Sequence, residues 1–160
     1  MPTTASPAAR PVGPTAAPAG WRWPLPPPVR VVRGFDPPAE PWLPGHRGVD
    51  LAGRPGERVL AAGAGVVSFA GAVANVGVVS VASGQLRTTY QPVRPQVRVG
   101  QRVAAGDVLG HLVVAGSHCA PAACLHWGLL RGGVYLDPLA LVGRARVRLL
   151  PLHRDLGLTE

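Results

Sequence analysis

Two short stretches of the sequence hold residues that could bind a metal ion. The first is Gly45–Asp50 (GHRGVD), in which the imidazole of His46 and the carboxylate of Asp50 are four positions apart. In an extended chain an even separation places two side chains on the same face. An imidazole nitrogen and a carboxylate oxygen make half of a zinc site. A capped loop histidine followed by a turn aspartate would give the same pattern.

The second stretch is Cys124–Leu129 (CLHWGL), in which large apolar residues alternate with other residues. Such alternation is typical of a strand with one face in the core. The opposite face holds His126 beside a thiol and a glycine, which leaves open space. His126 is therefore a candidate third ligand, and the alternative is a half-exposed strand histidine.

Three protein ligands and one open position are the arrangement of a catalytic zinc ion. Such an ion lowers the pKa of a water molecule to about 7 and polarises a carbonyl, which together favour amide hydrolysis. The sequence has no His-Glu-x-x-His motif, which excludes a thermolysin-like site.

The composition favours an all-β domain. The chain has 160 residues, of which 47% are hydrophobic but only 5% aromatic, with 21 glycines and 19 prolines. This balance disfavours a helical bundle and favours short strands with tight turns. The formal net charge is +8 and every basic residue is arginine. These charges are scattered without interleaved aromatics, which favours non-specific attraction to an anionic polymer, such as a cell wall, over nucleic-acid binding; simple solubility is the alternative.

The chain divides into three parts. Residues 1–20 are rich in Ala and Pro and predict a disordered linker, residues 21–143 form the folded domain, and residues 144–160 are a basic tail. Many short strands predict a two-layer sandwich or barrel-like pair of antiparallel sheets. The predicted strands cover 31–35, 58–62, 65–70, 76–82, 85–91, 107–114 and 125–130, and residues 46–51 run from a loop into a further strand.

Turn residues refine this prediction. Gly63-Ala64 and Ser83-Gly84 each predict a hairpin, and 136–143 could form one short helical turn. The phrases 55–59 (PGERV) and 99–103 (VGQRV) are alike, which a duplicated β-hairpin unit would explain.

Together these motifs resemble the lysostaphin/LytM family of peptidoglycan endopeptidases over residues 29–142. The stretches that carry the resemblance, in the family's order and intervals, are 45–51, Gly56, 59–67, 88–90, 99–103, 106–110 and 125–128. The resemblance implies antiparallel sheets of the duplicated hybrid motif. It implies zinc bound by His46, Asp50 and His126, and cleavage of cross-bridges or stem peptides in peptidoglycan. We accordingly expect a monomer that is extracellular or associated with a bacterial cell wall.

The chain departs from this family at two positions. Active members carry His-x-His on the last motif and Tyr-x-His on an earlier one, whereas this sequence has Cys124 and Pro92 where the assisting histidines stand. General acid–base assistance is typically worth about 10²–10⁴ in rate. Two functions therefore remain open: a zinc endopeptidase, and a catalytically impaired relative that binds the cell wall or regulates other proteins.

Two nearby residue types bear on this question. His118 or His111 could replace an assisting histidine, and His118 is the better candidate because it precedes the metal-binding strand; the alternative is a surface loop histidine. Cys124 could form a disulfide with Cys119, act as a fourth zinc ligand, or remain a free thiol. The disulfide is favoured because disulfides persist in exported proteins.

Other classes are less consistent with the sequence. The stretch 99–110 resembles a lipoyl or biotin carrier, but the chain has no lysine to carry the cofactor. No run approaches the ~18 apolar residues of a membrane span, and the first residues do not show the charged-then-apolar pattern of a secretory signal.

Overall fold

The computed structural model describes residues 20–143, which form eleven strands and one short 3₁₀ helix. The predicted basic tail, and all of the predicted linker except Gly20, lie outside the described residues. The elements are β1 (Val31–Arg33), β2 (Val49–Gly53), β3 (Arg58–Leu60), β4 (Gly65–Val73), β5 (Val76–Ser83), β6 (Leu86–Gln91), β7 (Val93–Pro95), β8 (Arg102–Val103), β9 (Val108–Leu112), β10 (Ala123–Arg131), β11 (Val134–Leu136) and η1 (Pro138–Val142).

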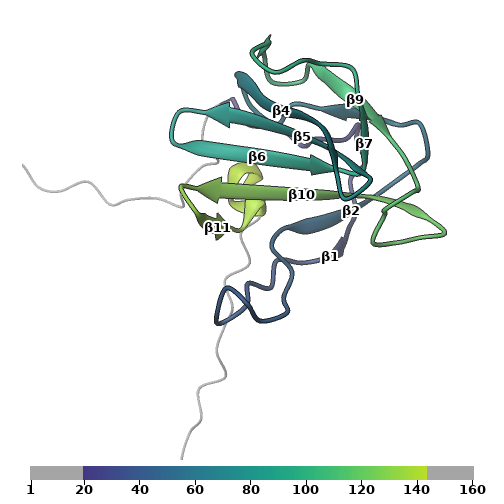
Figure 1. Ribbon diagram of the computed structural model, residues 1–160. Helices are drawn as coiled ribbons and strands as arrows, with labels where there is room; N and C mark the ends of the chain where they lie inside the picture. The colour runs from purple at the N-terminus through teal and green to yellow at the C-terminus, as the bar shows by residue number, and fades with distance from the viewer. Residues whose placement is uncertain (1–19, 144–160) are drawn as a thin grey trace, which may run out of the picture.

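The strands form two antiparallel sheets. The larger sheet has the order β1-β2-β10-β6-β5-β4-β8, with β11 paired to the far end of β10, and the smaller sheet has the order β3-β9-β7. Figure 1 shows β4, β5, β6 and β10 side by side, with β7 and β9 at one end of this layer. The predicted all-β fold of two antiparallel sheets is confirmed, and the sheets do not close into a barrel.

Both sheets contribute to one buried apolar cluster. Trp127 of β10 and Tyr90 of β6 are the largest fully buried side chains from the larger sheet, and Leu109 and Leu112 of β9 are buried from the smaller one. The alternation seen in the sequence of β10 explains this arrangement, because every second side chain of a strand points to the same face. The inward face of β10 thus belongs to the core, and His126 lies on the other face.

Tyr90 fixes the inward face of β6. Its hydroxyl accepts a hydrogen bond from the amide of Ala62 (2.9 Å) and donates one to Oγ1 of Thr88 (2.9 Å). Burial raises the pKa of Tyr90 to about 12, so the phenol is neutral throughout the physiological range. Because Tyr90 and Thr88 point inward, Gln91 and Thr89 point to the open face of the sheet.

One predicted hairpin is confirmed and one is wrong. β5 and β6 pair around Ser83-Gly84 as predicted, whereas β3 pairs with β9, and β4 pairs with β5 and β8, so Gly63-Ala64 does not join a hairpin. Gly63 instead makes room for Trp21, since a Cβ there would lie 2.3 Å from the indole ring. The hairpin formed by β4 and β5 turns at Ala74-Asn75, both with positive φ (48° and 66°), and neither of these turn residues is a glycine.

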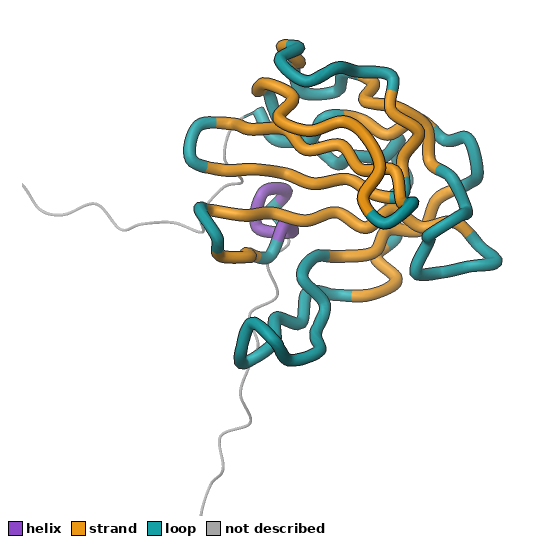
Figure 2. The backbone as a smooth tube through the Cα atoms, in the orientation of Figure 1, coloured by secondary structure: helices purple, strands orange, loops and turns teal. Residues whose placement is uncertain are grey.

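The repeated phrases form matching turns. The amide of Gly56 donates to the carbonyl of Leu112 (2.7 Å), and that of Gly100 donates to the carbonyl of Val67 (2.8 Å). Both glycines have positive φ (82° and 90°), which glycine adopts without strain. Each turn leads into a short strand, β3 or β8, but these strands belong to different sheets. The predicted helical turn is present as η1, which is drawn in purple in Figure 2.

Candidate metal centre and groove

The pairing of β2 with β10 brings two of the predicted ligands together. Asp50 and His126 are directly opposite one another in the register, and Asp50 Oδ1 lies 2.9 Å from His126 Nδ1. Their strand neighbours Leu51 and Trp127 are fully buried on the other face. The core residues therefore determine which way the carboxylate and the imidazole point.

His46 reaches the same point from the loop that precedes β2. Its backbone pairs with Asp36 in an isolated β-bridge, and its Nδ1 lies 2.8 Å from the carbonyl oxygen of Gly34. A carbonyl only accepts hydrogen bonds, so Nδ1 carries the proton and the lone pair of the neutral ring is on Nε2. This Nε2 lies 3.1 Å from Asp50 Oδ1 and 3.2 Å from His126 Nδ1.

Gly48 permits the close approach of the loop to β10. A Cβ at this position would lie 2.4 Å from the carbonyl oxygen of Trp127 and 2.9 Å from the ring of His126. Any larger residue would push the two strands apart at the level of the ligands. The glycine at position 48 of the first motif is thus explained by its close packing against the second motif.

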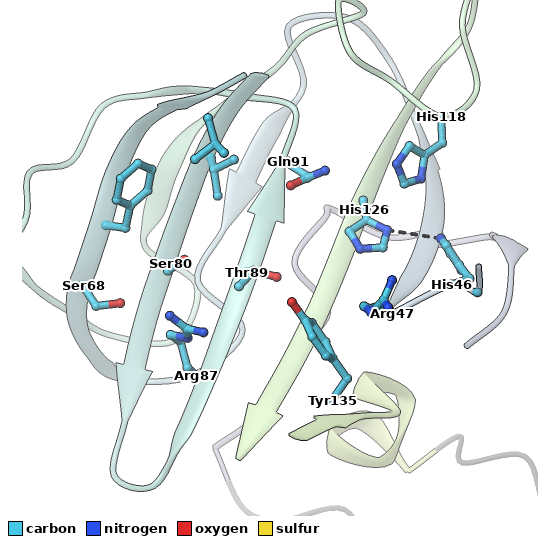
Figure 3. Close-up of a pocket in the computed structure, with 14 residues that line it drawn as sticks. His46, Arg47, Ser68, Ser80, Arg87, Thr89, Gln91, His118, His126 and Tyr135 are labelled. Carbon is cyan, nitrogen blue, oxygen red and sulfur yellow. Dashed lines mark hydrogen bonds between the residues drawn. The ribbon is translucent and has the colours of Figure 1, made fainter. Parts of the chain in front are cut away.

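His118 joins this cluster from the loop between β9 and β10. Its Nδ1 lies 3.1 Å from both carboxylate oxygens of Asp50. His46, Asp50, His118 and His126 each offer one ligand atom, and these atoms all lie within 4.8 Å of one another. Figure 3 shows the three imidazoles pointing toward a common point. The structure thus brings a fourth donor to a site for which the sequence predicted three, while His111 lies on β9 in the smaller sheet.

The surroundings of Asp50 favour its ionised form. Burial by itself would raise the pKa of Asp50, but the hydrogen bond from His126 and the nearby His46 and His118 outweigh it. The net effect lowers the pKa of Asp50 below its ordinary value. The carboxylate is therefore charged at neutral pH, which is the form that binds a metal ion.

The donor set fits zinc. Bonds of about 2.0–2.2 Å place neighbouring ligand atoms of a tetrahedral zinc ion roughly 3.3 Å apart or slightly more. The separations among His46 Nε2, His126 Nδ1 and Asp50 Oδ1 are 2.9–3.2 Å, within a few tenths of an ångström of this value. Imidazole and carboxylate are also the ligand types that zinc prefers when cysteine is absent.

The two cysteines are joined to each other. Cys119 and Cys124 form a disulfide with Cα atoms 5.7 Å apart, so Cys124 offers no thiolate to a metal ion. Ser117 Oγ accepts hydrogen bonds from the amides of both cysteines (3.1 Å each). The disulfide thus ties the residue that follows His118 to β10.

A groove of about 620 Å³ extends from the histidines across the open face of the larger sheet. Gln91 is opposite His126 in the register of β6 and β10, and Thr89 is opposite Gly128. Pro92, which stands where the family has a histidine, is buried. The groove residues are Gly45, His46, Arg47, Ser68, Phe69, Val73, Val78, Ser80, Arg87, Thr89, Gln91, His118, His126 and Tyr135.

Sequence reasoning missed most of this groove, because only its histidines, His46, His118 and His126, were predicted as site residues. The lining includes two arginines and several hydroxyl groups, and none of its residues is acidic. Figure 3 shows Gln91, Thr89, Ser80 and Ser68 on strands to one side of His126, with Tyr135 below it.

Comparison with known proteins identifies the family. The family model described as Peptidase family M23 matches residues 44–138, a span that begins just before His46 and includes Asp50, His118 and His126. The chain belongs to peptidase family M23. This confirms the resemblance to the lysostaphin/LytM peptidases, from which this M23 domain departs at Cys124 and Pro92.

Curated relatives of this M23 domain occur in mycobacteria. Uncharacterised proteins of Mycobacterium bovis and Mycobacterium tuberculosis are each 54% identical to it over 138 residues, which is 83% of this chain. The match covers 55% of each relative, so the chain spans about half the length of these proteins.

Solved structures share the fold of the M23 domain. A zinc-containing peptidase from Vibrio cholerae matches with a TM-score of 0.66 at 22% identity, over 78% of this chain and 40% of that one. A structure of the SpoIIQ-SpoIIIAH pore-forming complex matches with a TM-score of 0.64 at 23% identity, over 76% of this chain and 90% of that one. At these identities both likenesses concern the fold alone.

Proposed function

We propose that this M23 domain is a zinc-dependent endopeptidase that hydrolyses peptide bonds in the cross-links or stem peptides of bacterial peptidoglycan. The observation that carries the proposal is the position of His46, Asp50 and His126 at one end of the groove, with nitrogen and oxygen donors converging. Membership of a peptidase family supports the hydrolase activity.

The residues of the chain have distinct roles in this proposal. His46, Asp50 and His126 hold the metal ion. When bound, zinc supplies a Lewis acid that polarises a peptide carbonyl and makes water nucleophilic near neutral pH. The partly buried hydrogen bond between His46 Nδ1 and the carbonyl of Gly34 keeps the lone pair of His46 directed at the site. The same kind of orienting contact typically contributes 10–100-fold to metal affinity.

The groove positions the substrate. An extended peptide that lies along it would pass Gln91 and Thr89, whose side chains can hydrogen-bond peptide groups. The two arginines of the lining, Arg47 and Arg87, suit a substrate that carries carboxylates. These features support a peptide substrate from an anionic cell wall.

The proposed location is outside the cytoplasm, in or near the cell wall. The Cys119–Cys124 disulfide supports this proposal, because disulfides persist mainly in oxidising compartments. No helix in residues 20–143 is long and apolar enough to cross a membrane.

A second candidate function is a wall-binding or regulatory module without catalysis. Two observations favour it: Cys124 is committed to a disulfide, and Pro92 is buried and has no exchangeable proton. Neither residue can provide the general acid–base assistance that the family's histidines provide.

Zinc stoichiometry combined with a hydrolysis assay distinguishes these functions. Purified protein is analysed for bound zinc, and release of dye from labelled peptidoglycan is measured with and without a chelator. One zinc per chain with chelator-sensitive release supports the peptidase. One zinc without release favours the second candidate, and absence of zinc after incubation with the metal contradicts the proposed site.

A further inference from the structure

The loop between β9 and β10 holds features that the proposed hydrolysis does not need. His118 on this loop contacts both oxygens of Asp50 at 3.1 Å. Its ligand atom lies within 4.8 Å of those of the other three residues. Four protein donors are typical of a closed zinc site, whereas hydrolysis needs one open position.

The loop is fastened on both sides of His118. On one side Ser117 Oγ accepts hydrogen bonds from the amides of Cys119 and Cys124 (3.1 Å each). On the other side Cys119 is bonded to Cys124, which is two positions before His126 on β10. The disulfide therefore ties the residue after His118 to the strand that holds another ligand.

His118 is also the most accessible of the four donors. The side chains of Asp50 and His46 are 2% and 3% exposed, that of His126 is 14% exposed, and that of His118 is 38% exposed. The first three are attached to β2, to its preceding loop, or to β10. His118 lines the groove from an exposed loop, so it can leave the site without disturbing a strand pair.

We propose that His118 is a fourth protein ligand of the metal ion, held there by the Cys119–Cys124 disulfide, and that the site opens toward the groove when His118 withdraws. This inference rests on the zinc site of the proposed function. The inference also gives Cys124 a role. Through its disulfide with Cys119, Cys124 positions a histidine of the loop, whereas active family members carry a histidine on the strand itself.

Metal affinity and metal spectroscopy test the ligand assignment. The zinc dissociation constant is measured by competition with a chromophoric chelator, and the visible absorption spectrum is recorded for the cobalt(II) form. His118→Ala is expected to raise the dissociation constant about 10–100-fold and to change the cobalt spectrum through loss of one nitrogen donor. His111→Ala, which removes an imidazole outside the cluster, is the control and should change neither quantity.

The role of the disulfide is tested by a thermodynamic cycle. Replacing both cysteines, Cys119→Ser with Cys124→Ser, should weaken zinc binding toward the value of His118→Ala. In the His118→Ala background the same replacement should cause no additional loss, because the two changes act through one contact. If the double cysteine variant does not fold, Ser117→Ala is a milder test. It removes the hydroxyl that accepts hydrogen bonds from the amides of both cysteines, and it is also expected to weaken zinc binding.

The outcomes separate this inference from the proposed function. If the unaltered protein binds zinc but His118→Ala leaves the affinity and the cobalt spectrum unchanged, the inference is wrong and the three-ligand site stands. Loss of wall hydrolysis at unchanged affinity would also overturn it, since His118 would then transfer protons without binding the metal. If the unaltered protein binds neither metal, both proposals fail. If the losses of zinc affinity from the cysteine replacements and from His118→Ala are additive, the disulfide does not act through His118, and that part of the inference is wrong.

Discussion

Asp50 and His126 face one another directly across the pairing of β2 and β10, with Oδ1 and Nδ1 2.9 Å apart, although 76 positions separate them in the sequence. This register determines the site, because a shift of one residue would turn either side chain into the core. The fully buried Leu51 and Trp127 on the opposite face prevent such a shift. The apolar core of the larger sheet thus maintains the polar geometry on its other face.

Asp50→Asn is expected to abolish zinc-dependent stabilisation while preserving the shape of the side chain. The amide is neutral and binds zinc weakly, so the three imidazoles lose the anion around which they gather. A ligand present at 100 times its dissociation constant stabilises a protein by about 2.7 kcal/mol. Zinc should therefore raise the melting temperature of the unaltered protein and of His111→Ala, but not that of Asp50→Asn. Equal increases in all three would show that zinc binds elsewhere.

Gly48→Ala is expected to weaken both the fold and the metal site. The added Cβ would lie 2.4 Å from the carbonyl oxygen of Trp127, which belongs to the backbone and cannot rotate away. Overpacking of this kind costs about 1–3 kcal/mol, and separating β10 from the loop should also raise the zinc dissociation constant.

Gly133→Ala is the matched control for this change. A Cβ at Gly133 would meet nothing within 4 Å, and its φ is not in the positive range. Chemical denaturation and zinc titration should thus leave Gly133→Ala unchanged. If both variants behave alike, the close approach at Gly48 does not limit the site.

The candidate ligands could be predicted from the sequence because their local signals are strong. The alternation in β10 placed His126 opposite the core, and the four-residue spacing of His46 and Asp50 predicted a shared face. Which strands pair, and in which register, depends on contacts between distant segments. Local patterns therefore predicted neither the position of Gln91 beside His126 nor the approach of His118 to Asp50.

The wrong and missing turns have a similar physical cause. Glycine is common in turns, which made Gly63 look like part of a hairpin turn. The glycine is instead needed because Trp21 packs against it. The Ala74-Asn75 turn adopts positive φ without glycine, so residue types alone did not reveal it. Tertiary packing thus explains the glycine at position 63, and the turn at Ala74-Asn75 joins the two long paired strands β4 and β5.

Tyr90→Phe is expected to lower stability at neutral pH and to reduce the loss of stability in alkali. Without the hydroxyl, the amide of Ala62 loses its acceptor, which costs about 1–3 kcal/mol for a buried donor. The pKa of Tyr90 is raised to about 12 from an ordinary value of about 10. The native state therefore holds the proton more tightly, and this contribution is complete below pH ~10 and is lost as the pH rises toward 12.

The free energies of unfolding of Tyr90→Phe and the unaltered protein should converge between pH 10 and 12. Urea denaturation at pH 7 and pH 11 measures this convergence. Tyr135→Phe is the control, because Tyr135 is 38% exposed and should show neither effect. A constant difference at the two pH values would mean that Tyr90 does not ionise on unfolding in this range.

Ser68→Trp is expected to block wall hydrolysis without affecting the metal. Ser68 of β4 lines the groove, and in the larger sheet β5 and β6 separate β4 from β10, which holds His126. An indole there would fill part of the path of an extended peptide, so we expect dye release from labelled peptidoglycan to fall about tenfold or more at unchanged zinc stoichiometry. Val99→Trp, at a 64% exposed position outside the groove, should retain normal release. If Ser68→Trp also retains normal dye release, the substrate reaches the metal by another path. If Ser68→Trp loses zinc together with dye release, the indole has distorted the sheet, and the result does not test the groove.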